Sequence, residues 1–462
     1  MSGFMYRTEK DLLGSVKVPS DAYYGSETQR SLDSFKVSGI RNPIELVHAY
    51  AMLKKAAALA NMKDGKLDGK KAKAIAMACD YVIAGKLDGQ FNIDVFQAGA
   101  GTSLNMNVNE VIANKAIELL GGRKGNYRLV HPNDHVNMSQ STNDTMPCVV
   151  HIATYMAIKK RLVPSLKMLE GELDRKAKEF KGTIKMGRTH LQDAVPMTLG
   201  QEFSGYKGAL GNAIGMIDDA KDRMLHIPLG GTAVGTQINA DRRYERVAVK
   251  EINRMTKSHF VLSKNKFPMM QQRIEELAVA DALKEGATAI NKIANDLRIL
   301  ASGPAGGMGE IILPEILPGS SIMPGKVNPS MAEMMNMVCL NVMGSCTTVT
   351  EAANGGQLEI NVFTPIIAHN LLFSINTLSN ASRLFAQRCI AGIKVNRGGI
   401  SKHLEMDISL ATALSPYIGY AKASKIASIA RREHKSVKQV CIELNVMGKK
   451  ELDRILDPKN QV

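Results

Sequence analysis

The chain has 462 residues, of which 45% are hydrophobic and 22% charged, so it has room for about two to four domains and is too apolar to be disordered. Its net charge of +15 is spread along the sequence, aromatic residues are 5% and Trp is absent, which disfavours nucleic acid as the partner. No apolar run approaches the roughly 20 residues that span a bilayer, and no apolar leader follows the N-terminus, so we expect a cytoplasmic protein without membrane contact.

Residues 1–140 mix turn signals with shorter helical stretches, and long helices are predicted after them. Between 201 and 226 the apolar residues recur at three, four or seven positions, as in Phe203, Tyr206 and Leu210. Similar periodicity predicts helices over 153–180, 275–300, 331–353 and 365–393. Pro164 should kink or delay the first of these.

These long helices predict a mainly α fold with a central helical bundle, in which most of the 26 Met residues fill the core. A basic stretch after about residue 395 indicates a small separate helical unit. We predict three domains, an N-terminal domain (1–140), a central helical-bundle domain (141–395) and a small C-terminal helical domain (396–462).

Two polar clusters precede predicted helices. The first, 99–110, crowds hydroxyls and amides behind a Gly-x-Gly turn, but it lacks the third Gly and the β-α-β context of a dinucleotide site. The second is Ser139-Gln-Ser-Thr-Asn-Asp144. By themselves, both clusters are typical of helix N-caps.

No metal site is predicted. His131 and His135 have the i, i+4 spacing of a metal pair, but Pro132 and Asn133 replace the Glu-containing helix of a zinc protease. The six cysteines form no C-x-x-C pair, so we interpret them as reduced, mostly buried thiols. Another His, His190, lies among polar groups in segment 187–196, directly before a predicted helix.

The segment Pro318–Pro329 is the most unusual loop, with three Pro, two Gly and two adjacent Ser between helical stretches. It is not a phosphate loop, because the Gly spacing is wrong and Val327 stands where a magnesium-binding hydroxyl belongs. Lys326 and Asn328 point to one side if this piece is extended, and together they would suit a carboxylate. A surface turn is the alternative.

Gly319-Ser-Ser-Ile-Met-Pro-Gly-Lys-Val-Asn-Pro329 resembles the signature of the aspartase/fumarase superfamily. The clusters around Thr102, Ser141 and His190 resemble that superfamily's other active-site regions in the same order, and the likeness extends from Asp11 to Leu414. The resemblance implies a homotetramer of three-domain subunits built on a shared helical bundle. It also implies active sites composed of loops from three subunits.

Members of this superfamily eliminate a group β to a carboxylate, and the resemblance assigns roles on that basis. The substrate is a small dicarboxylate, and stabilising its enediolate-like dianion demands directed donors. Ser320 is expected to be the general base on a mobile loop, and His190 to line the leaving-group side. The expected substrate-binding residues are Thr102, Ser141 and Thr142 on the carboxylate that becomes the dianion, Thr189, Lys326 and Asn328 on the other carboxylate, and Asn143 beside the leaving group.

The loops favour aspartate ammonia-lyase over class II fumarate hydratase. Gly99-Ala-Gly-Thr-Ser103, Ser141-Thr-Asn143 and Gly356-Gln-Leu-Glu359 resemble aspartase. Thr28-Gln-Arg-Ser31, Leu229-Gly-Gly-Thr-Ala-Val234 and Asn361-Val-Phe363 resemble fumarase instead.

Other readings stay open beside these two. A catalytically silent relative and a basic nucleic-acid-binding protein are the alternatives from other classes of function. No cofactor is required by the expected reaction, and divalent-cation activation cannot be read from the sequence. Ala305 departs from the pattern, because both branches commonly place an Arg there.

Overall fold

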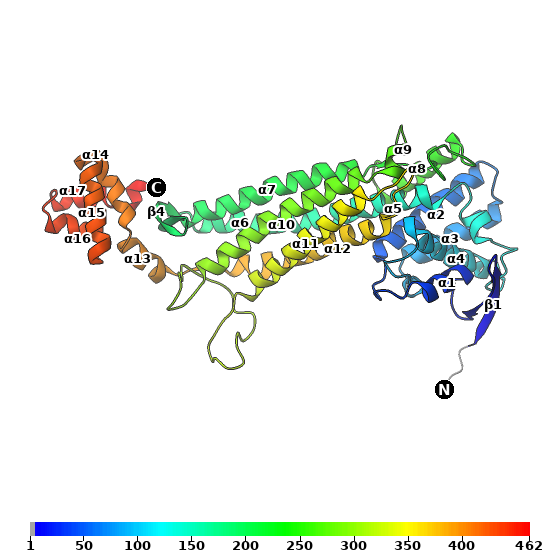
Figure 1. The fold of residues 1–462 in the computed structure, drawn as a ribbon, viewed down its shortest axis with the longest axis horizontal. Helices are drawn as coiled ribbons and strands as arrows, with labels where there is room; N and C mark the ends of the chain where they lie inside the picture. The colour runs from blue at the N-terminus through cyan, green and yellow to red at the C-terminus, as the bar shows by residue number, and fades with distance from the viewer. Residues whose placement is uncertain (1–4) are drawn as a thin grey trace. The chain divides into compact units, whose positions relative to one another are not determined.

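The computed structural model describes residues 5–462 and has the predicted mainly α architecture, drawn in Figure 1. The first helices are α1 (Ser26–Ser34), α2 (Ile44–Lys63), α3 (Gly69–Ile83), α4 (Thr102–Leu119) and α5 (Thr142–Ala157). The middle of the chain forms α6 (Val163–Glu179), α7 (Leu199–Arg223), α8 (Arg242–Thr256), α9 (Phe267–Gln271), α10 (Ile274–Leu300), α11 (Ser330–Asn354) and α12 (Thr364–Arg388). The last helices are α13 (Arg397–Glu405), α14 (Ser415–Ile418), α15 (Tyr420–Glu433), α16 (Val437–Glu443) and α17 (Lys449–Ile455).

Within residues 5–462, strands occur in four separate pairs. Antiparallel hairpins join β1 (Tyr6–Asp11) to β2 (Gly14–Pro19) and β3 (Ile184–Thr189) to β4 (Gln192–Thr198). The pair β5 (His226–Ile227) and β6 (Val261–Leu262) is parallel, and the pair β7 (Ile311–Ile312) and β8 (Lys394–Val395) is antiparallel.

The predicted long helices are confirmed, with one difference at Pro164. Four of them, α7, α10, α11 and α12, begin and end within a few residues of the sequence prediction. The stretch predicted over 153–180 is instead the end of α5, a π-helical turn over Ile158–Leu162, and α6. A Pro has no N–H for the helix ladder, so the widened turn directly before Pro164 absorbs the missing hydrogen bond.

The chain divides into two compact units, each made of several segments. The first unit comprises residues up to Pro164, Gly215–Glu285 and Asn341–Leu378, and the second comprises Ser165–Ile214, Gly286–Leu340 and Ser379–Val462. This division follows spatial contacts, so the long helices contribute to both units. The three-domain division of the sequence stays a prediction.

In the first unit, α2 packs against α3, α5 and α8, and α4 packs against α3. Ala-rich faces of α2 and α3 allow this close approach, and Leu46, Leu53 and Ile75 fill the space between helices.

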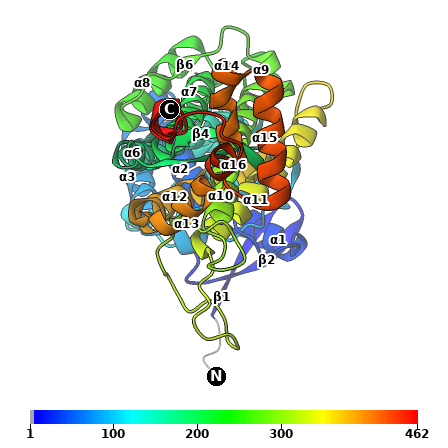
Figure 2. The same ribbon diagram turned by 90° about the vertical axis from the view of Figure 1, so that its left-hand side faces the viewer.

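In the second unit, polar contacts tie the long helices to one another. Tyr206 of α7 donates to Asp296 of α10 at 2.9 Å, and Asn336 of α11 donates to Asn295 of α10 at 3.0 Å. The C-terminal helices, drawn in orange and red in Figure 2, have a hydrophobic core of their own that includes Leu414 and Val440. No helix among the described residues is long and apolar enough to cross a membrane.

Candidate functional site

The N-terminus of α4 follows a tight left-handed turn. Ala100 and Gly101 have φ values of 57° and 85°, and a Cβ on Gly101 would lie 2.9 Å from Sδ of Met146. The backbone N–H of Ala100 donates to the carbonyl of Val362 at 2.8 Å, which fixes the turn to the segment before α12. Thr102 is therefore held as the first, exposed residue of α4.

The N-terminus of α5 is a capping box. The side chain of Ser141 accepts from the N–H of Asn143 at 3.2 Å, and Asp144 accepts from the N–H of Ser141 at 2.9 Å. Asn143 donates to the carbonyl of Ala233 at 2.8 Å. The cap expected from the sequence is confirmed, and it brings the loop before α8 against the same helix end.

Asp144 is a buried carboxylate beneath this cluster. Its second oxygen accepts from the N–H of Gly230 at 2.9 Å, so one side chain ties the α5 N-terminus to the loop at 229–235. Burial raises the pKa of the Asp144 carboxyl to about 6, although the N–H donors of Ser141 and Gly230 oppose this shift.

The two helix N-termini meet through one hydrogen bond. Asn105 on the first turn of α4 donates to Oγ1 of Thr142 on the first turn of α5 at 2.9 Å. Unpaired backbone N–H groups and the helix dipole favour an anion at such ends. Thr102, Ser141 and Thr142 add hydroxyls there, so this cluster has the chemistry to hold a carboxylate.

Thr189 and His190 lie at the exposed tip of the β3–β4 hairpin. His190 and Leu191 have φ values of 56° and 59°, as a two-residue type I′ turn requires. The preceding strand is anchored by the buried Glu310, which Lys185 contacts at 2.9 Å and Arg188 at 2.7 Å. Burial alone would raise the pKa of the Glu310 carboxyl, but these two cations outweigh it and hold the pKa below its ordinary value.

The loop between β7 and α11 presents Ser320 with backbone donors aimed at it. The N–H groups of Ile322 and Met323 donate to Oγ of Ser320 at 3.2 and 2.9 Å. Such donors stabilise a negatively charged oxygen more than a neutral hydroxyl, so they favour the ionised form.

Asn328 closes the base of this loop. Its Nδ2 donates to the carbonyl of Gly319 at 2.6 Å, while the N–H of Gly319 donates to the carbonyl of Lys326 at 3.0 Å. A Cβ on Gly319 would collide with the Lys326 carbonyl. One amide hydrogen of Asn328 is thus committed to the loop, and Lys326 is exposed beside it.

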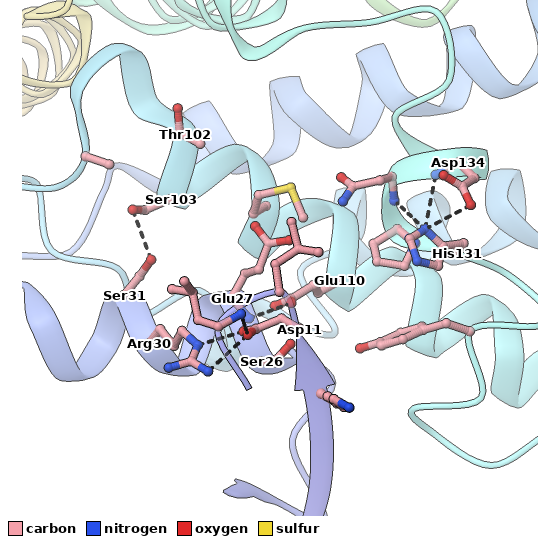
Figure 3. Close-up of a pocket in the computed structure, with 18 of the residues that line it drawn as sticks. Asp11, Ser26, Glu27, Arg30, Ser31, Thr102, Ser103, Glu110, His131 and Asp134 are labelled. Carbon is pink, nitrogen blue, oxygen red and sulfur yellow. Dashed lines mark hydrogen bonds and ion pairs between the residues drawn. The ribbon is translucent and has the colours of Figure 1, made fainter. Parts of the chain in front are cut away.

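A cavity of about 780 Å³ in the first unit has Thr102 on its wall, as Figure 3 shows. Its other wall carries His131, whose Nδ1 accepts from the N–H groups of Asn133 and Asp134 at 3.2 Å each. His131 and His135 lie in or beside a π-helical turn, and Lys71 lies 3.1 Å from Nε2 of His135. A cation at this distance is unfavourable for a metal pair. Within residues 5–462, no cluster of three or more His, Cys, Asp or Glu side chains could hold a metal ion.

The nine predicted site residues fall into two groups by unit. The first unit holds Thr102, Ser141, Thr142 and Asn143. The second unit holds Thr189, His190, Ser320, Lys326 and Asn328. Within each group the residues sit at helix starts or on loops, but their roles stay predictions.

Two family models match the chain, one described as Lyase over residues 14–344 and one described as Fumarase C C-terminus over 410–461. A Neisseria meningitidis fumarate hydratase class II is 46% identical over 99% of both chains, and a Bacillus subtilis one is 45% identical over 99% of both. The chain belongs to the class II fumarate hydratase family. The crystal structure of a Schistosoma mansoni class II fumarase matches with a TM-score of 0.95 and 38% identity over 98% of both chains. A Brucella melitensis protein described as fumarate lyase:delta crystallin bound to cobalt gives a TM-score of 0.94 at 44% identity over 98% of this chain and 99% of its own.

The superfamily prediction from the sequence is therefore correct, but the choice of aspartate ammonia-lyase is wrong. The aspartase-like residues at 103 and 142 have plain structural contacts. Ser103 is buried and its hydroxyl bonds Ser31 at 3.0 Å, while Thr142 offers the same kind of hydroxyl that a Ser would. Conversely, the fumarase-like segment 229–234 lies against the predicted site residue Asn143, because the carbonyl of Ala233 accepts from its side chain.

Several residues of the site region were missed by the sequence reasoning. Asp144 was noted only as the end of a cap, and Asn105 only as one amide among several. Lys54 and Glu310 were not singled out at all, although both are fully buried charged residues. The position of Lys54 inside the otherwise apolar, Ala-rich run 49–60 was the one sequence signal that could have pointed to it. Ala305, the departure noted in the sequence, is exposed in the loop between α10 and β7, and nothing in the structure explains it.

Proposed function

We propose that this chain catalyses the reversible hydration of fumarate to L-malate. The observation that carries the proposal is the likeness to proteins named fumarate hydratase class II, at 46% identity over 99% of both chains, together with the match to the fumarase C-terminal model. The likeness spans all the loops that carry the candidate residues.

The proposed chemistry explains the donors at the two helix N-termini. Dehydration of malate removes a proton from the carbon next to a carboxylate, and the electron pair moves into that carboxylate to form an enediolate-like dianion. The C–O bond then breaks as the double bond of fumarate forms, and the hydroxide takes up a proton from an acid on the leaving-group side, for which His190 is the candidate, to depart as water. The dianion is the high-energy species, so we assign Thr102, Ser141 and Thr142 to the carboxylate on which it develops.

Ser320 is proposed as the base that takes the proton. A Ser hydroxyl is a poor base in water, and it needs donors that favour its ionised form. The N–H groups of Ile322 and Met323, which donate to its Oγ, support this assignment over Ser321. Closure of the loop over substrate would exclude water and strengthen these interactions.

The remaining residues are assigned to the rest of the substrate. Thr189, Lys326 and Asn328 would hold the second carboxylate, and Asn143 and His190 would face the departing hydroxyl group. These residues come from both compact units, and we propose that a homotetramer completes each site with loops from three subunits. The addition of water to fumarate changes no oxidation state overall, so no redox cofactor is assigned, and the proposed compartment is the cytoplasm.

The test is the appearance of fumarate in the ultraviolet, with L-malate in one cuvette and L-aspartate in another. Fumarate from malate alone is the expected result. Fumarate from aspartate alone would overturn the proposal, and no fumarate from either substrate would indicate a catalytically silent relative. Ser320→Ala serves as the matched inactive variant, with its folding checked by thermal melting.

A further inference from the structure

A buried lysine lies behind the carboxylate-binding cluster of the first unit. Lys54, in the middle of α2, has no exposed surface, and its ammonium group donates to Oδ1 of Asn137 at 2.7 Å. No carboxylate lies within ion-pair distance of it among residues 5–462. A buried cation compensated by one amide oxygen and the more distant charge of Asp144 is costly to a fold, which makes its presence beside the site informative.

Hydrogen bonds connect this lysine to Thr142. Asn137 accepts from Lys54 and also, more weakly at 3.4 Å, from Nδ2 of Asn105. The same Nδ2 donates to Oγ1 of Thr142 at 2.9 Å. These bonds form one hydrogen-bond network that runs from Lys54 through Asn137 and Asn105 to Thr142. The network ends at a hydroxyl that we propose touches substrate.

The ammonium group of Lys54 favours one donor and one acceptor in each hydrogen bond of this network. An ammonium group can only donate, so Asn137 must turn its oxygen toward Lys54, and its Nδ2 then donates to the carbonyl of Gln140 at 3.3 Å. Asn105 must meet that oxygen with its NH2 group, because its own oxygen would be repelled. The NH2 group also faces Thr142, whose oxygen accepts and whose proton is left to point elsewhere.

We propose that Lys54 is a positioning residue for catalysis, which acts through Asn137 and Asn105 to keep the Thr142 hydroxyl a donor to the substrate carboxylate. The proposal rests on the proposed function of Thr142. Without Lys54, only the 3.3 Å bond to the Gln140 carbonyl holds Asn137 in this orientation. Both amides then flip more easily, and Thr142 can donate its proton to Asn105 instead. A carboxylate that gains charge in the transition state would then meet an oxygen lone pair.

The chain offers a sharp set of variants. Lys54→Met keeps the length and apolar stem of the side chain but removes the donor. Asn105→Asp keeps the shape of the amide but presents an oxygen that accepts from Thr142. Lys55→Met, one residue along α2, removes a lysine that pairs with Asp80 and lies outside the chain of bonds, so it is the control.

The expected result with L-malate is a fall in kcat/KM of about tenfold to a hundredfold for Lys54→Met and for Asn105→Asp, with kcat falling more than KM rises. Lys55→Met should stay within about twofold of the parent, in keeping with the small worth of an exposed pair. Thermal melting and the oligomeric state of each variant show that the comparison is between folded enzymes. If Lys54→Met fails to fold, Asn105→Asp carries the test.

The decisive measurement is a double-mutant cycle with Thr142→Val. If Lys54 acts through Thr142, Lys54→Met should cost less than about twofold in a Thr142→Val background. Costs that multiply would overturn the proposal, as would full activity of both Lys54→Met and Asn105→Asp.

Failure of the proposed function gives a different pattern. In that case the parent itself makes no fumarate from malate, and the cycle is measured on the affinity for succinate, a dicarboxylate that cannot react. Equal succinate affinity of the parent and Lys54→Met would then overturn the role of Lys54.

Discussion

Replacement of Lys54 by Met should make the folded protein more stable, even though we expect it to make the enzyme slower. Burial lowers the pKa of the Lys54 ammonium group from 10.5 to about 7, because water no longer solvates its charge. The group therefore binds its proton more weakly in the folded than in the unfolded protein. Met has no charge to bury and nearly the same volume.

The size of the effect follows from the two pKa values. A difference of about 3.5 in pKa corresponds to about 5 kcal/mol of destabilisation when the pH is well below 7. Loss of the bond to Asn137 offsets about 1 to 3 kcal/mol of this gain. Near pH 7 we therefore expect Lys54→Met to be more stable by about 1 to 3 kcal/mol.

The difference in stability between the parent and Lys54→Met depends on pH. Between pH 7 and 10.5 the unfolded chain binds more protons than the folded protein at this group, so the parent gains stability as the pH rises. Lys54→Met has no such titrating group, so the difference in unfolding free energy in its favour should shrink by about 2 kcal/mol between pH 7 and pH 9. Asp144, whose pKa Lys54 helps to lower, titrates near pH 6 and stays ionised in this window.

The assay is urea unfolding of the parent, Lys54→Met and Lys55→Met at pH 7, 8 and 9, at one fixed protomer concentration because the proposed tetramer makes stability depend on concentration. A gap between parent and Lys54→Met that is the same at all three pH values would refute the reasoning. It would mean that Lys54 keeps an ordinary proton affinity in the fold.

Three further predictions concern the other parts of the site and the fold. Ser320→Ala should lower kcat for malate by at least about a hundredfold with little change in KM, and steady-state kinetics would contradict the base assignment if activity persisted. Glu310→Gln should cost about 3 kcal/mol in chemical unfolding at pH 7, the low end for breaking a buried ion pair, because Arg188 loses its carboxylate while Lys185 keeps a second one in Glu202. The pKa of Glu310 is lowered in the fold, so the stability advantage of the parent fades as the pH falls below about 4.5. Gly25→Ala should lower the stability of the fold by more than about 3 kcal/mol, since the added Cβ would lie 2.7 and 2.8 Å from buried carboxylate oxygens. Gly171→Ala, on the open face of α6, should raise the stability by about 0.5 to 1 kcal/mol. Equal melting temperatures for these two variants would count against the packing argument.

The sequence predicted what local pattern determines. The period of Phe203, Tyr206 and Leu210 was enough to find α7, because one face of that helix must be apolar for its whole length. The residues at helix starts and on the 318–329 loop were found because Gly, Pro and short hydroxyl side chains are typical of such positions. The π-helical turn before Pro164 was not found, since a missing N–H can be absorbed by a kink, a break or a widened turn.

Long-range partners were beyond the reach of the pattern. A Lys in an Ala-rich helix is ordinarily exposed to solvent, and the acceptor that Lys54 meets in the core, Asn137, comes 83 positions later in the chain. The same holds for Glu310, whose partners Lys185 and Arg188 come from a different strand pair. A charged residue in an apolar segment can be recognised in the sequence, but the residue that pairs with it is identified only in the folded structure.

The wrong choice between two lyases has a chemical cause. L-Aspartate and L-malate share both carboxylates and the proton that is removed, and they differ in one leaving group. In the proposed assignment, the hydroxyls at the N-termini of α4 and α5 bind the shared part, so a Ser or a Thr at 142 would serve either substrate. Discrimination must come from groups around the leaving hydroxyl or ammonium. We propose Asn143 as one of them, and the carbonyl that Asn143 contacts belongs to the fumarase-like segment 229–234. The loops richest in polar residues were therefore the least able to distinguish the two reactions. The segment 229–234, which has no charged side chain, indicated the correct family.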